Sequence, residues 1–171
     1  MRNGSYPTRV LQTHPARSSA RNSFPGLCSA LADYLAAREA ILDGEIVHLD
    51  AEGRPQFMPL LRRQPQQFVA FDVLWLNGRF LTKLALVDRK RILRSVLPAG
   101  SPVLYADYIE TKGTELFGAV CEMDLEGIVA KRKDGLYTAE ATSWVKIKNP
   151  NYSQAEGRRE LFERRKAAVE A

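Results

Sequence analysis

The stretch QQFVAFDVLWL (residues 66–76) is rich in β-branched and aromatic side chains, and Asn77-Gly78 follows it directly. This composition is typical of a largely buried strand, and an Asn-Gly pair is a strong signal for the tight turn that closes one. The strand carries one acid, Asp72, between apolar neighbours. A carboxylate in such surroundings is costly unless it is paired, hydrogen-bonded or bound to a cation. The stretch therefore predicts a buried strand whose acid needs a partner.

Helices and further strands are predicted on both sides of this strand. Before it, Leu27, Leu31 and Leu35 recur every four residues and predict an amphipathic helix over residues 24–40. A strand that contains ILDGEIV is predicted over residues 40–50 and ends in the turn DAEG. After the central strand, the patterns predict helices over 87–98 and 111–124 and strands over 102–110, 125–132 and 143–149. The succession predicts an α+β (mixed α/β) fold without an internal repeat.

Three segments of different composition divide the chain. Residues 1–22 contain four arginines, no acid and no lysine, and they predict an irregular or disordered lead-in, with an Arg/Ser-rich targeting peptide as the alternative. Residues 23–150 hold the regular patterns and predict one domain. Residues 151–171 predict a charged C-terminal helix, whose basic side chains either face solvent or contact DNA.

The overall composition suits one modest globular domain of 171 residues, 45% of them hydrophobic and 26% charged. The net charge of +5 favours a polyanionic partner only weakly. Cys28 and Cys121 stand in no metal or redox spacing and are predicted to be buried free thiols. Because the chain has only two histidines, a zinc site of His and Cys ligands is not expected. No apolar run approaches membrane-spanning length, so we expect a soluble, cytoplasmic protein without a membrane partner.

The stretch SWVKIKNP (residues 143–150) sets two lysines two residues apart on a predicted strand. Because side chains alternate along a strand, Trp144, Lys146 and Lys148 share one face. Val145 and Ile147 form the other face, which is predicted to join the core. Two ammonium groups on one face predict a surface that binds an anion.

Two further acids stand in apolar stretches, Glu45 in ILDGEIV and Glu126 in LEGIVAK. A single acid of this kind is most simply an edge-strand residue that faces solvent. Together with Asp72 and three lysines, however, they match the usual parts of a site for phosphoryl or nucleotidyl transfer. In such sites carboxylates hold a divalent ion and lysines neutralise phosphate oxygens. The lysines are Lys131, Lys146 and Lys148.

Four stretches of the chain resemble, in the family's order, the nucleotidyltransferase motifs of ATP-dependent DNA ligases: ILDGEIV, FVAFDVLWLNG, LEGIVAKR and SWVKIKNP. Each motif alone is a weak signal, but the ordered set is specific. The resemblance implies an ATP-grasp-like nucleotidyltransferase domain of the DNA ligase type, with antiparallel-rich sheets flanked by helices. The sequence after Asn149 is similar to the ending of compact bacterial ligases without an OB-fold.

The resemblance implies ATP and Mg²⁺ as cofactors and nicked double-stranded DNA as the partner, in DNA repair, recombination or replication. In the family, a motif lysine takes AMP from ATP, the AMP passes to a 5′-phosphate at the nick, and the 3′-hydroxyl displaces it. Glu45 matches the acid that contacts the nucleotide's sugar and helps to hold the metal, and Glu126 matches the second metal-linked acid. Both are therefore predicted metal ligands and catalytic residues.

Four more residues match nucleotide-binding positions of the family. Phe71 matches the aromatic that stacks on adenine, although an aromatic in a buried strand is also a candidate for the core. Lys131 matches the basic residue that ends its motif and is predicted to bind the cofactor. Lys146 and Lys148 match the pair that binds the α-phosphate and are predicted to be both catalytic and cofactor-binding.

One motif of the family has no match in the sequence. Lys-x-Asp-Gly carries the nucleophile and should precede Glu45, but the first lysine of the chain is Lys83. A lysyl-adenylate needs an activated amine, so the sequence predicts an N-terminally incomplete, truncated adenylation domain. The alternatives are a non-catalytic module that binds ATP or nicked DNA, and a degenerate remnant with exposed sheet edges.

Overall fold

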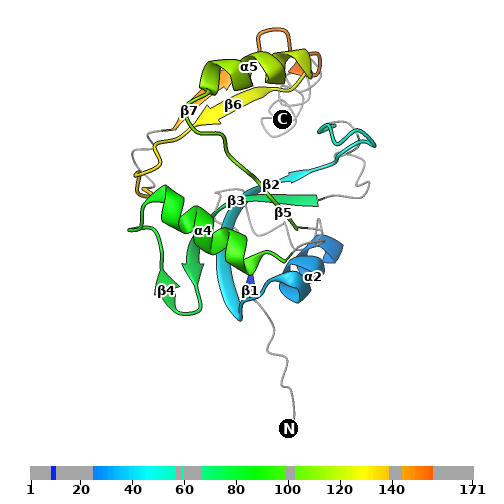
Figure 1. Ribbon diagram of the computed structural model, residues 1–171. Helices are drawn as coiled ribbons and strands as arrows, with labels where there is room; N and C mark the ends of the chain where they lie inside the picture. The colour runs from blue at the N-terminus through cyan, green and yellow to red at the C-terminus, as the bar shows by residue number, and fades with distance from the viewer. Residues whose placement is uncertain are drawn as a thin grey trace, which may run out of the picture.

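The computed structural model describes residues 9–10, 25–56, 59, 67–98, 103–138 and 144–155. Within these residues the chain forms a five-stranded sheet, a two-stranded sheet and three helices (Figure 1). Most strand pairs are antiparallel, and the helices pack against the sheets. The predicted α+β fold with antiparallel-rich sheets flanked by helices is confirmed.

The larger sheet is built around β3 (Gln67–Leu76), the strand predicted from the apolar stretch. β2 (Glu39–Val47) pairs antiparallel with β3, and β1 (Arg9–Val10) pairs parallel with β2. The last residues of β3 also pair with β4 (Arg79–Phe80), and its first residues pair with β5 (Val103–Tyr105). β3 is therefore the central strand of the sheet.

Local backbone requirements fix the pairing of β2, β3 and β4. Asn77 and Gly78 both have positive φ, 46° and 91°, as a type I′ turn between β3 and β4 requires, so the predicted turn is confirmed. In β2, a Cβ atom on Gly44 would lie 2.4 Å from a ring atom of Phe68 and 2.5 Å from the carbonyl oxygen of Val69. Only glycine allows the two strands to approach this closely.

Two helices contribute to the core of the larger sheet. α2 (Pro25–Tyr34) buries Leu27 and Leu31, and Leu35 after it is also buried, as their spacing predicts. α4 (Leu86–Val96) packs directly against β3. These contacts hold β3 in the middle of a close-packed interior. The buried apolar cluster consists of Leu27, Leu31, Leu35, Ala40, Leu42, Phe68, Ala70, Val73, Leu81, Leu93, Val96, Leu97 and Val103.

The smaller sheet consists of β6 (Gly127–Ala130) and β7 (Val145–Lys148), and α5 (Gly113–Glu122) packs against β6. Figure 1 shows these three elements together on one side of the larger sheet. The prediction that Val145 and Ile147 join the core is wrong, because their side chains are 58% and 39% exposed. The reason is that α5 covers β6, so the described part of the chain leaves the apolar side of β7 open.

Most predicted elements extend beyond the observed ones, and the difference is largest for α2 and β5. α2 ends at Tyr34 rather than at residue 40, because Glu39 and Ala40 already pair in the larger sheet. β5 contains only three residues, since the chain after Tyr105 no longer pairs with β3. The predicted lead-in and C-terminal helix lie mostly outside the described residues, and the part of the lead-in that is described forms β1.

Cys28 and Cys121 are free, as predicted, but half-buried rather than buried. None of the described helices has the length and apolar character needed to cross a bilayer.

Candidate functional site

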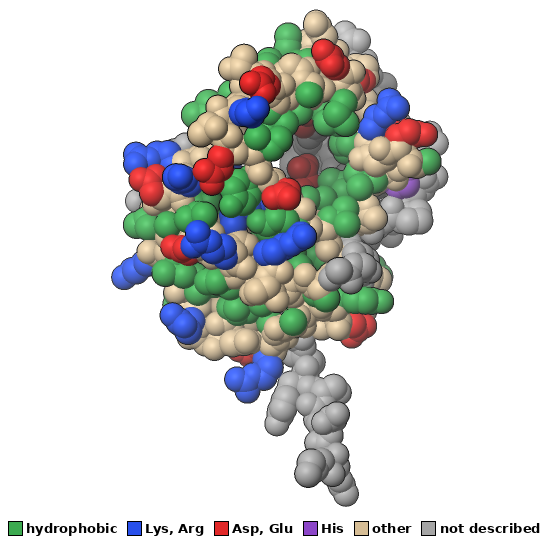
Figure 2. Space-filling view, in the orientation of Figure 1, with side chains coloured by type: hydrophobic (Ala, Val, Ile, Leu, Met, Phe, Trp, Pro, Cys, Tyr) green, Lys and Arg blue, Asp and Glu red, His purple; other side chains and the backbone are tan. Residues whose placement is uncertain are grey.

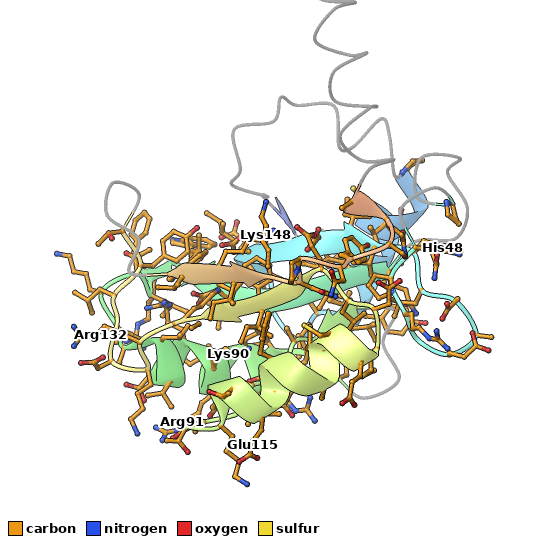
Figure 3. All side chains as sticks on the ribbon, turned by 90° about the horizontal axis from the view of Figure 1, so that it is seen from above. His48, Lys90, Arg91, Glu115, Arg132 and Lys148 are labelled. Carbon is orange, nitrogen blue, oxygen red and sulfur yellow. The ribbon has the colours of Figure 1, made fainter. Side chains whose placement is uncertain are left out.

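The predicted site residues lie on two sheets that face each other. Seen from above, β6 and β7 lie over β2 and β3 (Figure 3). Figure 2 shows a hollow between the smaller sheet with α5 and the body of the domain. The larger sheet carries Glu45 and Phe71, and the smaller sheet carries or borders Glu126, Lys131, Lys146 and Lys148.

Lys131, directly after β6, reaches across to the larger sheet. Its Nζ lies 4.4 Å from the ring centre of Phe71 on β3 and 3.6 Å from the ring centre of Trp144, which precedes β7. The two rings meet edge to face with their centres 6.5 Å apart. Burial lowers the pKa of Lys131, although nearby carboxylates act in the opposite direction. The structure thus brings Phe71 and Lys131 together, and their roles in binding a nucleotide stay predictions.

Tyr137 completes this aromatic group from the segment that follows Lys131. Its hydroxyl donates to Asp43 Oδ2 at 3.0 Å, and its ring lies edge-on to Trp144 with the centres 5.8 Å apart. Burial, and then the Asp43 carboxylate, raise the pKa of Tyr137 to about 12. The phenol therefore stays protonated and donates its hydrogen bond at neutral pH. The sequence does not predict Tyr137 as a site residue, because it lies between the motifs LEGIVAKR and SWVKIKNP and belongs to neither.

Asp72 has the partner that its apolar surroundings require. Arg89, on α4, donates from Nε to Asp72 Oδ1 at 2.8 Å and from Nη2 to Asp72 Oδ2 at 2.9 Å. The two side chains are buried, with 1% and 0% exposed. Sequence reasoning does not identify Arg89, but a signal exists. It lies one turn before the buried Leu93, so it is a basic residue on the buried face of an amphipathic helix.

Glu126 and Lys146 form an ion pair at the end of the smaller sheet. Oε1 of Glu126 lies 2.8 Å from Nζ of Lys146, and the side chains are 32% and 51% exposed. Next to this pair, Gly127 has φ +145°, and a Cβ atom on it would lie 2.1 Å from the carbonyl oxygen of Ile147. The buried Asn149 donates its backbone N–H to the carbonyl oxygen of Glu126 at 2.8 Å. Glycine and asparagine therefore fix the backbone from which Glu126 projects.

Lys148 and Glu45 are exposed residues of the two sheets. Lys148 pairs in register with Gly127, and Glu45 pairs with Val69. In the described part of the chain, no group of three or more His, Cys, Asp or Glu could hold a metal ion. Mg²⁺ does not require such a group, because it is usually held by one or two carboxylates together with substrate phosphates and water. The metal-binding and catalytic roles of these residues stay predictions.

Lys90, on α4, is a buried lysine that the sequence does not single out. It is 7% exposed, its Nζ donates to the carbonyl oxygen of Ala106, and the same atom lies 4.3 Å from the ring centre of Tyr105. Burial, followed by repulsion from Lys131, lowers the pKa of Lys90 to about 8. Lys90 is labelled in Figure 3 below the smaller sheet, away from Lys148.

Known proteins resemble this chain over most of its length. The model of the ATP dependent DNA ligase domain matches residues 5–148. The multifunctional non-homologous end joining protein LigD of Mycolicibacterium smegmatis is 37% identical over 124 residues, which are 70% of this chain and 16% of that protein. DNA ligase 2 of Methanosarcina acetivorans is 30% identical over 152 residues, which are 81% of this chain and 25% of that protein.

Solved structures of ligases share the fold. The ligase domain of LigD from M. tuberculosis superposes with a TM-score of 0.61 and 31% identity, covering 77% of this chain and 43% of that one. Mycobacterial DNA ligase D complexed with ATP and MES gives the same TM-score and identity and covers 44% of that chain. The chain therefore spans less than half of these ligase structures and 16% of the M. smegmatis protein. With its nucleotidyltransferase fold and its match to the ligase domain model, the chain belongs to the family of ATP-dependent DNA ligases, which are enzymes.

Proposed function

We propose that this chain binds ATP between its two sheets and serves the adenylyl transfer of a DNA ligase. In that reaction AMP passes from ATP to the 5′-phosphate at a nick with release of pyrophosphate, and the 3′-hydroxyl then displaces AMP and seals the strand. The contact between Phe71 and Lys131 carries this proposal, because it sets an aromatic ring of one sheet against a basic residue of the other. The solved ligase D that contains ATP supports the choice of nucleotide.

Phe71 supplies the stacking surface for the base in this proposal. Lys131 lies over one face of the ring, 4.4 Å from its centre, so adenine would stack on the opposite face. Lys146 and Lys148 are alternate residues of β7 and share one of its faces. Their ammonium groups would bind the α-phosphate and stabilise the charge that develops as it is transferred.

Glu45 and Glu126 fit a Mg²⁺ ion that is held mainly by the nucleotide's phosphates. Their carboxylate oxygens are the hard ligands that Mg²⁺ prefers, and both side chains reach solvent. The ion, when bound, neutralises charge on the phosphate oxygens. In the structure Lys146 balances the charge of Glu126. On binding, Lys146 would exchange Glu126 for a phosphate, and Glu126 would exchange Lys146 for the metal ion.

The sequence itself favours a second candidate function. It contains no Lys-x-Asp-Gly motif, and its first lysine is Lys83. A covalent lysyl-adenylate requires an activated amine at the α-phosphate, and the remaining cations do not replace it. For the printed sequence by itself, the second candidate is a non-catalytic module that binds ATP or nicked DNA.

Incubation of the purified chain with Mg²⁺ and α-labelled ATP separates the two candidates. Label that survives denaturation identifies a covalent adenylate, whereas reversible nucleotide binding without retained label identifies the binding module. The double variant Lys146→Ala/Lys148→Ala is expected to lose nucleotide binding. The matched control Lys83→Ala/Lys112→Ala removes two exposed lysines outside the site and is expected to bind like the wild type. A wild-type chain that neither binds nor retains ATP would contradict both candidates.

Nicked duplex DNA is the proposed partner, in a cytoplasmic DNA repair role. The LigD relatives are named for non-homologous end joining, and the net charge of +5 suits a polyanion. Fluorescence anisotropy with labelled nicked and intact duplexes of the same sequence tests this. Tighter binding to the nicked duplex is expected, and equal affinity for both would show that charge alone directs the binding.

A further inference from the structure

We propose that Arg89 is a positioning residue of the nucleotide site, because it ties the segment that follows Lys131 to the strand that carries Phe71. The expected effect on nucleotide binding rests on the proposed function. The tie between the two sheets is a property of the fold and does not depend on that function.

One side of the guanidinium holds β3. Nε and Nη2 of Arg89 donate to the two carboxylate oxygens of Asp72 at 2.8 and 2.9 Å, and Oδ1 of Asp72 also accepts from the backbone N–H of Val73 at 2.9 Å. Asp72 directly follows Phe71 in β3, at an irregularity of the pairing with β2 where Asp43 lies opposite Asp72 and Gly44 opposite Ala70. A bidentate pair of this kind is both strong and geometrically specific. Arg89 therefore fixes β3 at the residue next to Phe71.

The other side of the guanidinium holds the segment after β6. Nη1 of Arg89 donates to the carbonyl oxygen of Gly135 at 3.2 Å, and the backbone N–H of Leu86 donates to the same oxygen at 3.0 Å. The N–H of Val87 donates to the carbonyl oxygen of Lys133 at 3.0 Å. These N–H groups belong to the first turn of α4, where the helix itself provides no acceptor. Residues 133–135 are thus docked on the start of α4 and on Arg89.

Two residues that contact Trp144, Lys131 and Tyr137, flank the docked segment. Lys131 precedes Gly135 and has its Nζ 3.6 Å from the Trp144 ring centre, and Tyr137 follows with its ring centre 5.8 Å from that of Trp144. The guanidinium carbon of Arg89 itself lies 5.8 Å from the Tyr137 ring centre. A shift of the segment would therefore move Lys131 relative to Phe71. Positioning of this kind matters because small displacements at a site change binding and rates strongly.

A guanidinium is needed for this arrangement. Arg89 serves two oxygens of Asp72 and the carbonyl oxygens of Leu84 and Gly135 at the same time. The planar fork of arginine presents donors in these fixed directions, whereas the ammonium of lysine is a single point charge. Arg89→Lys is therefore expected to keep the charge and lose the tie.

The test uses Trp144 as a reporter in the full chain. The sequence has two tryptophans, so a Trp75→Phe background leaves Trp144 as the single one. In this background, Arg89→Lys is compared with Asp72→Asn/Arg89→Met, which leaves no unpaired buried charge and so protects the fold if the single variant does not fold. Two quantities are measured: the dissociation constant of Mg²⁺-ATP by calorimetry, and the acrylamide quenching of Trp144 without nucleotide.

The matched control is Lys90→Met, which removes a buried cation from the next position of the same helix. Lys90 donates to the carbonyl oxygen of Ala106, and its described interaction with residues 131–137 is electrostatic repulsion from Lys131 rather than a hydrogen bond that holds the segment. A merely structural loss of stability in α4 would affect this control as well. The control is expected to keep the wild-type ATP affinity and the wild-type quenching of Trp144.

For both Arg89 variants the dissociation constant of ATP is expected to rise roughly tenfold, the lower end of what loss of a supporting partner costs at metal sites. Quenching of Trp144 is expected to increase. Wild-type affinity and quenching in the Arg89 variants, or equal changes in the Lys90 control, would overturn the proposal. If the parent protein binds no ATP, the proposed function is wrong, and the quenching measurement still decides whether Arg89 holds the segment.

Discussion

Glu126 and Lys146, two residues predicted to contact the metal and the phosphate, are joined by an ion pair of 2.8 Å across the start of β6 and the middle of β7. Both side chains are partly exposed, so the pair stabilises the fold by only about 0.5 kcal/mol. A pair this weak is easily opened by a ligand. When nucleotide and metal bind, a phosphate would replace Glu126 as the anionic partner of Lys146. Mg²⁺ would replace Lys146 as the cationic partner of Glu126.

Removal of Mg²⁺ is therefore expected to weaken ATP binding in the wild type and to matter less in Glu126→Gln. In the wild type without metal, Glu126 competes with the phosphate for Lys146, whereas the amide of the variant does not. The variant should bind metal-free ATP about threefold to tenfold more tightly than the wild type, which corresponds to roughly 1 kcal/mol. Calorimetric titrations with Mg²⁺ and with EDTA measure this.

The control for that titration is Glu115→Gln, which breaks the exposed pair of Glu115 with Lys112 on α5. It removes one negative charge without touching the site, so its metal dependence should equal that of the wild type. An unchanged metal dependence in Glu126→Gln would show that Glu126 does not compete for Lys146.

Phe71→Ala is expected to raise the dissociation constant of ATP about tenfold, since stacking of a base on an aromatic ring contributes roughly 1–3 kcal/mol. Phe71→Trp keeps an aromatic surface and should retain most of the affinity. The matched control is Phe80→Ala on β4, where the side chain is 77% exposed and lies outside the site. Nucleotide titrations of the three variants test this, and equal affinities of Phe71→Ala and Phe80→Ala would exclude Phe71 as the stacking residue.

Gly127→Ala is expected to lower the free energy of unfolding by about 2–4 kcal/mol, because the new Cβ meets a backbone carbonyl and the residue has positive φ. The contact is that with the Ile147 carbonyl oxygen, at 2.1 Å. Gly118→Ala, in α5, is the matched control, since a Cβ there meets nothing within 4 Å. Alanine in this helix should stabilise by about 0.5–1 kcal/mol. Urea unfolding followed by circular dichroism measures both, and equal stability of the two variants would contradict the prediction.

The sequence predicts the central part of the fold because its signals are local. The apolar run of β3, the Asn77-Gly78 turn and the leucine spacing of α2 each depend on a few neighbouring residues, and each is confirmed. The four ligase-like motifs are also local signals, and their order in the sequence indicates the family that the comparison with known proteins shows. Strand and helix identity could therefore be predicted without knowledge of the packing.

What the sequence does not predict depends on contacts between distant segments. The need of Asp72 for a partner follows from its surroundings, but Arg89 as that partner follows only from how α4 packs on β3. The alternation in β7 predicts an apolar face, but whether another element covers Val145 and Ile147 is decided by the position of α5. Lys131 matches a motif, yet its place between two aromatic rings requires the two sheets to face each other.

Because of Lys90, the free energy of unfolding is expected to depend on pH in the alkaline range. Burial lowers its pKa in the folded chain from 10.5 to about 8, with repulsion from Lys131 adding to the shift and attraction to Asp72 and Asp107 opposing it. Between these two values the unfolded chain binds a proton that the folded chain lacks, so the free energy of unfolding rises with pH across this window. The gain is present above pH 10.5 and lost as pH falls through 8.

Urea unfolding of the wild type and of Lys90→Met at pH values of about 7.5 and 9.5 measures this term, which should be on the order of 1–2 kcal/mol. The wild type is expected to gain stability relative to Lys90→Met, because methionine has no proton to lose. Both pH values lie below the range in which the titration of Tyr137, whose pKa is raised to about 12, would change the free energy of unfolding in the opposite direction. Lys112→Met, at an exposed lysine, should follow the wild-type profile. Parallel profiles of the wild type and Lys90→Met would show that Lys90 stays charged in the folded chain across this range.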